Sequence, residues 1–177
     1  MPRVASLLLL LLVVPASCAD PVHDDDVKAL GGETPGVPRG PLHRPGQPCL
    51  TCHGGDGPAG SEFSVAGTVY LLQDQDVAAP NAVVTIEDVN GVAGSAVTNM
   101  AGSFWVNADT WRPTYPLKVS LKYLTLTARM NGAIGRAGSC ADCHQNSVAA
   151  NTAAQTSSGR VYVARAQSQI QKAMQAQ

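Results

Sequence analysis

The pattern Cys-x-x-Cys-His occurs twice in the chain and places two thiols and one imidazole within five residues. The first motif consists of Cys49, Cys52 and His53, and the second motif consists of Cys140, Cys143 and His144. Two thiols at this spacing reach the two vinyl groups of one porphyrin, and the adjoining imidazole ligates its iron. The sequence therefore predicts two haem c groups, with His53 and His144 as axial iron ligands.

Three other roles for the motif cysteines have to be weighed. Two cysteine pairs can bind structural zinc, but zinc does not require a histidine after each pair, and a long β-prone segment separates the pairs. Disulfides are common in exported chains, but they leave both histidines without a role. A thioredoxin-like redox pair opens a helix after a strand, and neither motif has that setting. Covalent haem is the interpretation that uses every residue of both motifs.

Each haem iron has a sixth position, and we consider two residues outside the motifs for it. His43 lies six residues before Cys49, in a Pro- and Gly-rich loop that can fold over the first haem; the alternative is a solvated side chain. Met130 lies ten residues before Cys140, at the expected exit from the last strand, and its alternative role is packing. Methionine raises the reduction potential relative to histidine, so the choice of ligand affects function.

The N-terminal residues predict an export signal. Residues 1–19 contain a basic residue, an apolar run over 4–14 that only Ser6 interrupts, and then small residues. The run is short for a membrane-spanning helix, so cleavage is expected. Cys18 becomes a lipidated first residue if this is a lipoprotein signal, although Pro15 departs from the usual aliphatic residue, or it is removed with the signal. The expected location is the bacterial periplasm or outer envelope.

The segment between the signal and the first motif is rich in proline and glycine. These residue types disfavour regular structure, so residues 20–47 are expected to form a flexible tether. Three consecutive aspartates, Asp24 to Asp26, are expected to be solvated, because their spacing is not that of a calcium loop. The net charge of −1 does not favour binding to nucleic acid or to an anionic membrane.

The segment between the motifs has the pattern of short strands. Apolar and polar residues alternate over 63–71 and again over 118–123, and Asn90-Gly91 is the strongest hairpin signal. A further short strand is expected near 160–163. This spacing predicts a mainly β fold, an antiparallel β-sandwich of about seven short strands flanked by two haem-binding loops.

The expected segments follow one another along the chain. They are the signal 1–19, the tether 20–47, the first haem loop 48–62, the sandwich 63–128, the second haem loop 129–163 and a C-terminal tail or short helix 164–177. The motifs flank the sandwich in sequence, so the two haems are expected at one end if its first and last strands are neighbours. Both loops are rich in glycine and polar residues, which predicts exposed haems suited to contact with protein partners.

The β-prone segment resembles a known family. The residues that carry the resemblance are Ala66 to Tyr70, Ala79 to Ile86 and Val97 to Phe104. They are similar to the carboxypeptidase regulatory-like (transthyretin-like) sandwich over about residues 63–128, which implies a non-catalytic domain. The paired motifs in an exported chain resemble those of a dihaem c-type cytochrome.

Together, the motifs and the resemblance imply an electron carrier rather than an enzyme. Its iron would cycle between oxidation states in the cell envelope, its partners would be redox proteins and not nucleic acid, and lipid at Cys18 would anchor it to a membrane. The alternative is an envelope binding or scaffold sandwich whose cysteine pairs hold zinc or form disulfides. A haem enzyme such as a peroxidase lacks a recognisable acid–base constellation in this sequence.

Overall fold

The computed structural model describes residues 20–33, 35–145 and 157–176 of the 177-residue chain. The predicted export signal and Cys18 lie outside the described residues. Within the described residues, no helix has both the length and the apolar character needed to cross a membrane.

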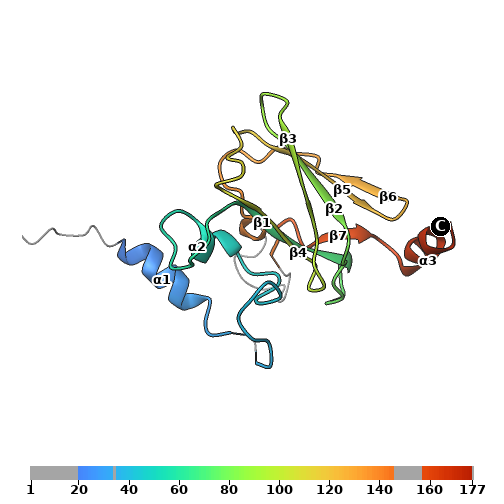
Figure 1. Cartoon of the computed structure of the whole chain (residues 1–177). Coiled ribbons are helices and arrows are strands. Elements are labelled where there is room, and N and C mark those ends of the chain that lie inside the picture. The colour runs from blue at the N-terminus through green and yellow to red at the C-terminus, as the bar shows by residue number, and fades with distance from the viewer. Residues whose placement is uncertain (1–19, 34, 146–156, 177) are drawn as a thin grey trace, which may run out of the picture.

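In the described part of the chain, seven strands form two sheets that face each other (Figure 1), which confirms the predicted mainly β sandwich. One sheet has the order β4-β1-β7 and the other the order β3-β2-β5-β6. The strands are β1 (Phe63–Leu72), β2 (Val83–Glu87), β3 (Ala93–Val97), β4 (Ser103–Asn107), β5 (Lys118–Tyr123), β6 (Leu126–Arg129) and β7 (Val161–Ala164). The helical elements are α1 (Pro21–Ala29), α2 (Cys49–His53), the 3₁₀ turn η1 (Cys140–Asp142) and α3 (Gln167–Gln175).

Alternating side chains build the core between the sheets. In β2, Val84 and Ile86 point inward and are buried, whereas Thr85 between them is only partly covered. Val69 of β1 and Leu117, just before β5, are fully buried in the same cluster. This is the period-two burial expected for strands that each show one face to a core.

The β2–β3 hairpin turns at Asn90-Gly91, as predicted, and Gly91 has a φ of +77°, which favours glycine. The Asp88 carboxylate accepts hydrogen bonds from the amides of Asn90 and Val92, at 2.8 and 3.0 Å. Burial raises the pKa of Asp88, but the hydrogen bonds from backbone amides outweigh it, so the pKa lies below its ordinary value. The hairpin therefore depends on an ionised side chain as well as on its turn residues.

The structure departs from the sequence predictions at two places. Strand β7 confirms the short strand expected near 160–163, but it pairs with β1 in parallel, so the sandwich is not wholly antiparallel. Helix α1 forms within the expected flexible tether, because Asp20 caps it by accepting from the amides of Val22 and His23, and Pro21 occupies the first turn, where its missing N–H costs nothing.

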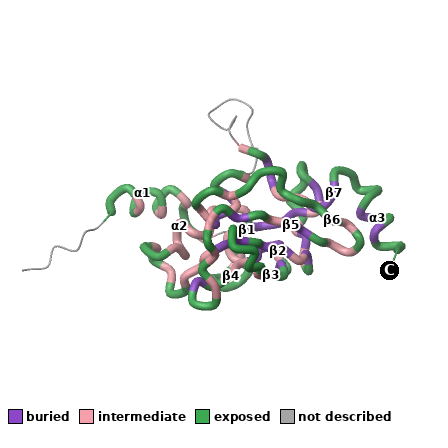
Figure 2. Tube along the Cα trace, turned by 90° about the horizontal axis from the view of Figure 1, so that it is seen from above, coloured by how far each residue is buried: buried purple, intermediate pink, exposed green. Residues whose placement is uncertain are grey.

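The two ends of the described chain lie at opposite ends of the molecule. Helices α1 and α2 are at one end and α3 is at the other, with the buried strands between them (Figure 2). Helix α3 confirms the short C-terminal helix, one of the two alternatives for that segment, and it contributes Ile170 to the core.

Candidate functional site

Strand β1 supports both motifs. The loop that leads into the first motif is fixed to it by a hydrogen bond from the Gly46 amide to Oγ1 of Thr68, at 2.8 Å. The segment that leads into the second motif pairs in parallel with β1, where the Ala66 amide donates to the Gly138 carbonyl at 3.0 Å. Both motif segments therefore attach to β1. The condition expected for this, that the first and last strands of the sandwich are neighbours, is not met, because β1 and β6 belong to different sheets.

Cys140 of the second motif packs directly against Gly67 of β1. A Cβ atom at Gly67 would lie 2.7 Å from Cβ and 2.9 Å from Sγ of Cys140, well inside van der Waals contact. Phe104 of β4 closes the other side of this space at 3.1 Å. Cys140 thus occupies the space that a side chain at position 67 would need.

The thiols of the two motifs influence one another electrostatically. Burial raises the pKa of Cys49 to about 11, and the charges of Asp142 and Cys52 raise it further against its own backbone hydrogen bond. Burial raises the pKa of Cys140 to about 12, with further contributions from Cys49, Asp142 and Cys143. All four motif cysteines are free thiols in the structure. Cys49 and Cys140 therefore lie within electrostatic reach of each other and are protonated at neutral pH.

His53 and His144 make the same hydrogen bond in two different settings. Nδ1 of His53 lies 2.8 Å from the Ser61 carbonyl oxygen, and Nδ1 of His144 lies 2.8 Å from the Gly159 carbonyl oxygen. A carbonyl oxygen only accepts, so Nδ1 carries the proton in both rings and Nε2 keeps its lone pair. This is the arrangement that fixes the tautomer and direction of a metal-binding imidazole.

A cavity of about 790 Å³ opens beside the first motif. This volume is in the range of protein sites for cofactors and drug-sized ligands, about 300–1,000 Å³. Its lining includes all three motif residues together with apolar side chains from helix α1, from its C-cap and from the sheet: Val27, Leu30, Phe63, Phe104 and Trp105. Phe63 stacks on the His53 ring with centroids 4.2 Å apart and planes 6° from parallel. The cavity is thus large and apolar enough for a flat hydrophobic ligand.

His43, in the segment that precedes the first motif, also lines this cavity. The centroids of the His43 and His53 rings are 6.0 Å apart and their planes differ by 70°. Two imidazoles that ligate one metal ion through nitrogens at about 2 Å have centroids roughly 6 Å apart. The separation of the two rings therefore suits one iron between them, and the residues at this site fit a haem.

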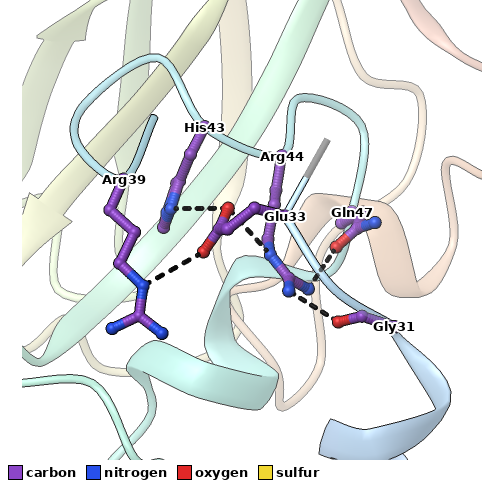
Figure 3. A network of polar contacts seen from close by, with 6 residues as sticks. All are labelled: Gly31, Glu33, Arg39, His43, Arg44 and Gln47. Atoms are coloured by element: carbon purple, nitrogen blue, oxygen red, sulfur yellow. Dashed lines mark hydrogen bonds and ion pairs between the residues drawn. The ribbon is translucent and has the colours of Figure 1, made fainter. Parts of the chain in front are cut away.

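His43 is held by a network around Glu33 (Figure 3). Nδ1 of His43 lies 3.5 Å from Oε2 of Glu33, and Arg39 and Arg44 pair with the same carboxylate at 3.8 and 3.3 Å. Glu33 has no signal in the sequence, since a single acidic residue in a Pro- and Gly-rich segment forms no pattern. Only the fold shows that it lies beside His43.

Met130, the other residue considered for a sixth position, is not part of this cavity. It follows β6, its amide donates to the Val119 carbonyl at 3.0 Å, and its side chain is partly exposed. Its role as a haem ligand stays a prediction.

The zinc alternative requires four ligands around one ion. Across residues 20–33, 35–145 and 157–176, no three His, Cys, Asp or Glu side chains are grouped to hold a metal ion. The zinc alternative therefore stays a prediction, as haem binding does.

Comparison with known proteins gives no relative for this chain. No protein-family model, curated protein or solved structure matches it. The resemblances to a carboxypeptidase regulatory-like sandwich and to a dihaem c-type cytochrome therefore stay predictions, and the local geometry of the two motifs carries the functional argument.

Proposed function

We propose that this chain is an exported electron-transfer protein with two covalently bound haems, one at each motif. Bound haem supplies a one-electron couple at its iron. Cys49 and Cys52 would hold the first haem and Cys140 and Cys143 the second, through thioether bonds. No acid–base group is needed, because the protein's task is to bind, orient and partly enclose each haem.

One observation carries this proposal: His53 and His144 both direct Nδ1–H to a backbone carbonyl oxygen at 2.8 Å. The carbonyls belong to residues eight and fifteen positions further along the chain, in loops with different sequences. The same orientation reached in two unrelated settings indicates a shared requirement for a free Nε2. A disulfide role, or a zinc ion held by the four cysteines alone, does not create that requirement.

The surroundings of the first motif support the same function. In the cavity, the Phe63 ring stacks on the His53 ring, and the centroid of the His43 ring lies 6.0 Å from that of His53. His43 would therefore be the second axial ligand of the first haem. Packing of both motifs on β1 favours electron exchange between the two haems. Redox proteins of the envelope are the expected partners, and lipid at Cys18 would keep the protein at a membrane.

The test is a pyridine haemochrome assay combined with the intact mass of the full-length exported protein, produced with a haem-attachment system. The expected result is two haems per chain, one fewer in Cys49→Ala/Cys52→Ala and one fewer in Cys140→Ala/Cys143→Ala. Cys18→Ser is the matched control, since it removes a cysteine without loss of haem and reveals any acyl mass. A chain that binds zinc instead, or that has only its polypeptide mass, would support the scaffold alternative and overturn the proposal.

A further inference from the structure

Nδ1 of His43 has no backbone partner, whereas Nδ1 of His53 has one. The His43 nitrogen is buried without a hydrogen bond, and Oε2 of Glu33 lies 3.5 Å from it. His53, by contrast, donates Nδ1–H to a neutral carbonyl. A carboxylate also only accepts, so a contact with Glu33 requires the proton on Nδ1 of His43 and leaves Nε2 free.

The position of Glu33 is fixed mainly by Arg44. Nε of Arg44 lies 3.3 Å from Oε2 of Glu33, and the Arg44 side chain is only 18% exposed. The rest of its guanidinium donates to Oε1 of Gln47 at 3.1 Å and to the Gly31 carbonyl at 2.6 Å (Figure 3). Arg39 adds a pair at 3.8 Å, but its side chain is 90% exposed, so that contribution is small.

This network connects the segment before the first motif to the motif itself. Gln47 lies two residues before Cys49, and Gly31 follows helix α1, so Arg44 ties both ends of the loop to one carboxylate. Glu33, His43 and Arg44 all line the cavity. The carboxylate is thus part of the cavity wall behind the His43 ring.

We propose that Glu33 is a positioning residue for the distal ligand of the first haem. It would hold the Nδ1–H of His43 so that Nε2 faces the iron, and its negative charge would make the imidazole a stronger donor. A negative charge beside the iron favours the oxidised state, so the first haem would have a lower reduction potential than it would with a neutral partner at this position. This inference rests on the proposed function.

The test compares Glu33→Gln and Glu33→Asp with the wild type, as full-length exported holoproteins. Glu87→Gln is the matched control, because Glu87 also pairs with a cation, Lys118 at 3.8 Å, but lies in β2. His43→Ala identifies the haem concerned as the one that becomes high-spin. The measurements are haem content, the two midpoint potentials and the electron paramagnetic resonance spectrum, which reports the relative orientation of the axial imidazoles.

Glu33→Gln should keep both haems. The midpoint potential of the first haem should shift in the positive direction, and the anisotropy of its electron paramagnetic resonance signal should change. The potential and the signal of the second haem should stay the same. Glu33→Asp should return both quantities toward the wild type. If Glu33→Gln loses the first haem, recovery of haem and potential in Glu33→Asp still supports positioning, and failure to recover overturns it.

Two further outcomes separate the inference from the proposed function. A wild-type chain without haem overturns both. A wild-type chain with two haems whose spectrum and potentials are the same in Glu33→Gln as in Glu87→Gln overturns only the role of Glu33.

Discussion

Substitution of Gly67 by alanine tests whether β1 provides the place for the second motif. The added Cβ would lie 2.7 Å from Cβ of Cys140, whereas carbon atoms in contact are about 3.5–4.0 Å apart. Phe104, at 3.1 Å, blocks a simple displacement of the new methyl group. Cys140 must therefore move by roughly 1 Å relative to the strand.

The displacement has two expected effects. Overpacking at a buried site costs about 1–3 kcal/mol, which lowers Tm by roughly 2–12 °C for a protein of this size. A shift of Cys140 also changes the distance between its thiol and that of Cys143. The two thiols would then no longer reach the two vinyl groups of one haem, so haem attachment at the second motif should fail. The first motif, held through Thr68, should keep its haem.

The assay counts haems per chain by pyridine haemochrome and locates them by peptide mass mapping. Gly135→Ala is the control, because a Cβ at Gly135 meets no atom within 4 Å and its backbone is not left-handed. One haem per chain in Gly67→Ala, attached at the first motif, is the expected result. Two haems and a Tm equal to that of Gly135→Ala would refute the reasoning.

The thiols, the hairpin and the core each provide a further prediction. In the haem-free chain, the raised pKa of Cys49, about 11, makes its alkylation at pH 8 roughly 100-fold slower than that of an ordinary thiol, and the rate should rise with pH through that pKa. The wild type should lose free energy of unfolding as pH falls through the depressed pKa of Asp88, because its carboxylate becomes protonated. Asp88→Asn should be less stable than the wild type above about pH 4 and should not show this loss. Urea unfolding at several pH values measures both effects. Ile86→Ala, at a fully buried site, should lower the free energy of unfolding by about 2–5 kcal/mol. Val97→Ala, at a side chain that is 60% exposed, should change it by less than about 0.5 kcal/mol in the same assay.

Much of the fold could be predicted because its signals are local. The alternation over 118–123, which is strand β5, and the Asn90-Gly91 turn each lie within a few residues, and the structure confirms both. The parallel pairing of β7 with β1 could not be predicted, since it joins segments about ninety residues apart and parallel pairing leaves no turn between the strands. Helix α1 was missed because proline was treated only as a helix breaker, although it is well suited to a first turn.

The candidate site divides in the same way. The motif thiols and imidazoles were found because haem attachment fixes their spacing along the chain. His43 was considered from its distance to Cys49, but Glu33 and the stacking of Phe63 on His53 arise from tertiary contacts that no spacing encodes. Gly67 was recognised only as part of a strand pattern, whereas the structure gives it the further task of making room for Cys140.

Consecutive residues of one strand contact the two motif segments: Gly46, three residues before the first motif, donates to Thr68, and Cys140 packs on Gly67. If each motif binds a haem, as proposed, this shared strand would limit how far the two haems can move relative to each other. Electron tunnelling slows steeply with distance, so thermal motion of the loops would affect docking to partners far more than the internal transfer step. With both haems bound, the protein would behave as a single two-electron store, filled by one partner and emptied by another.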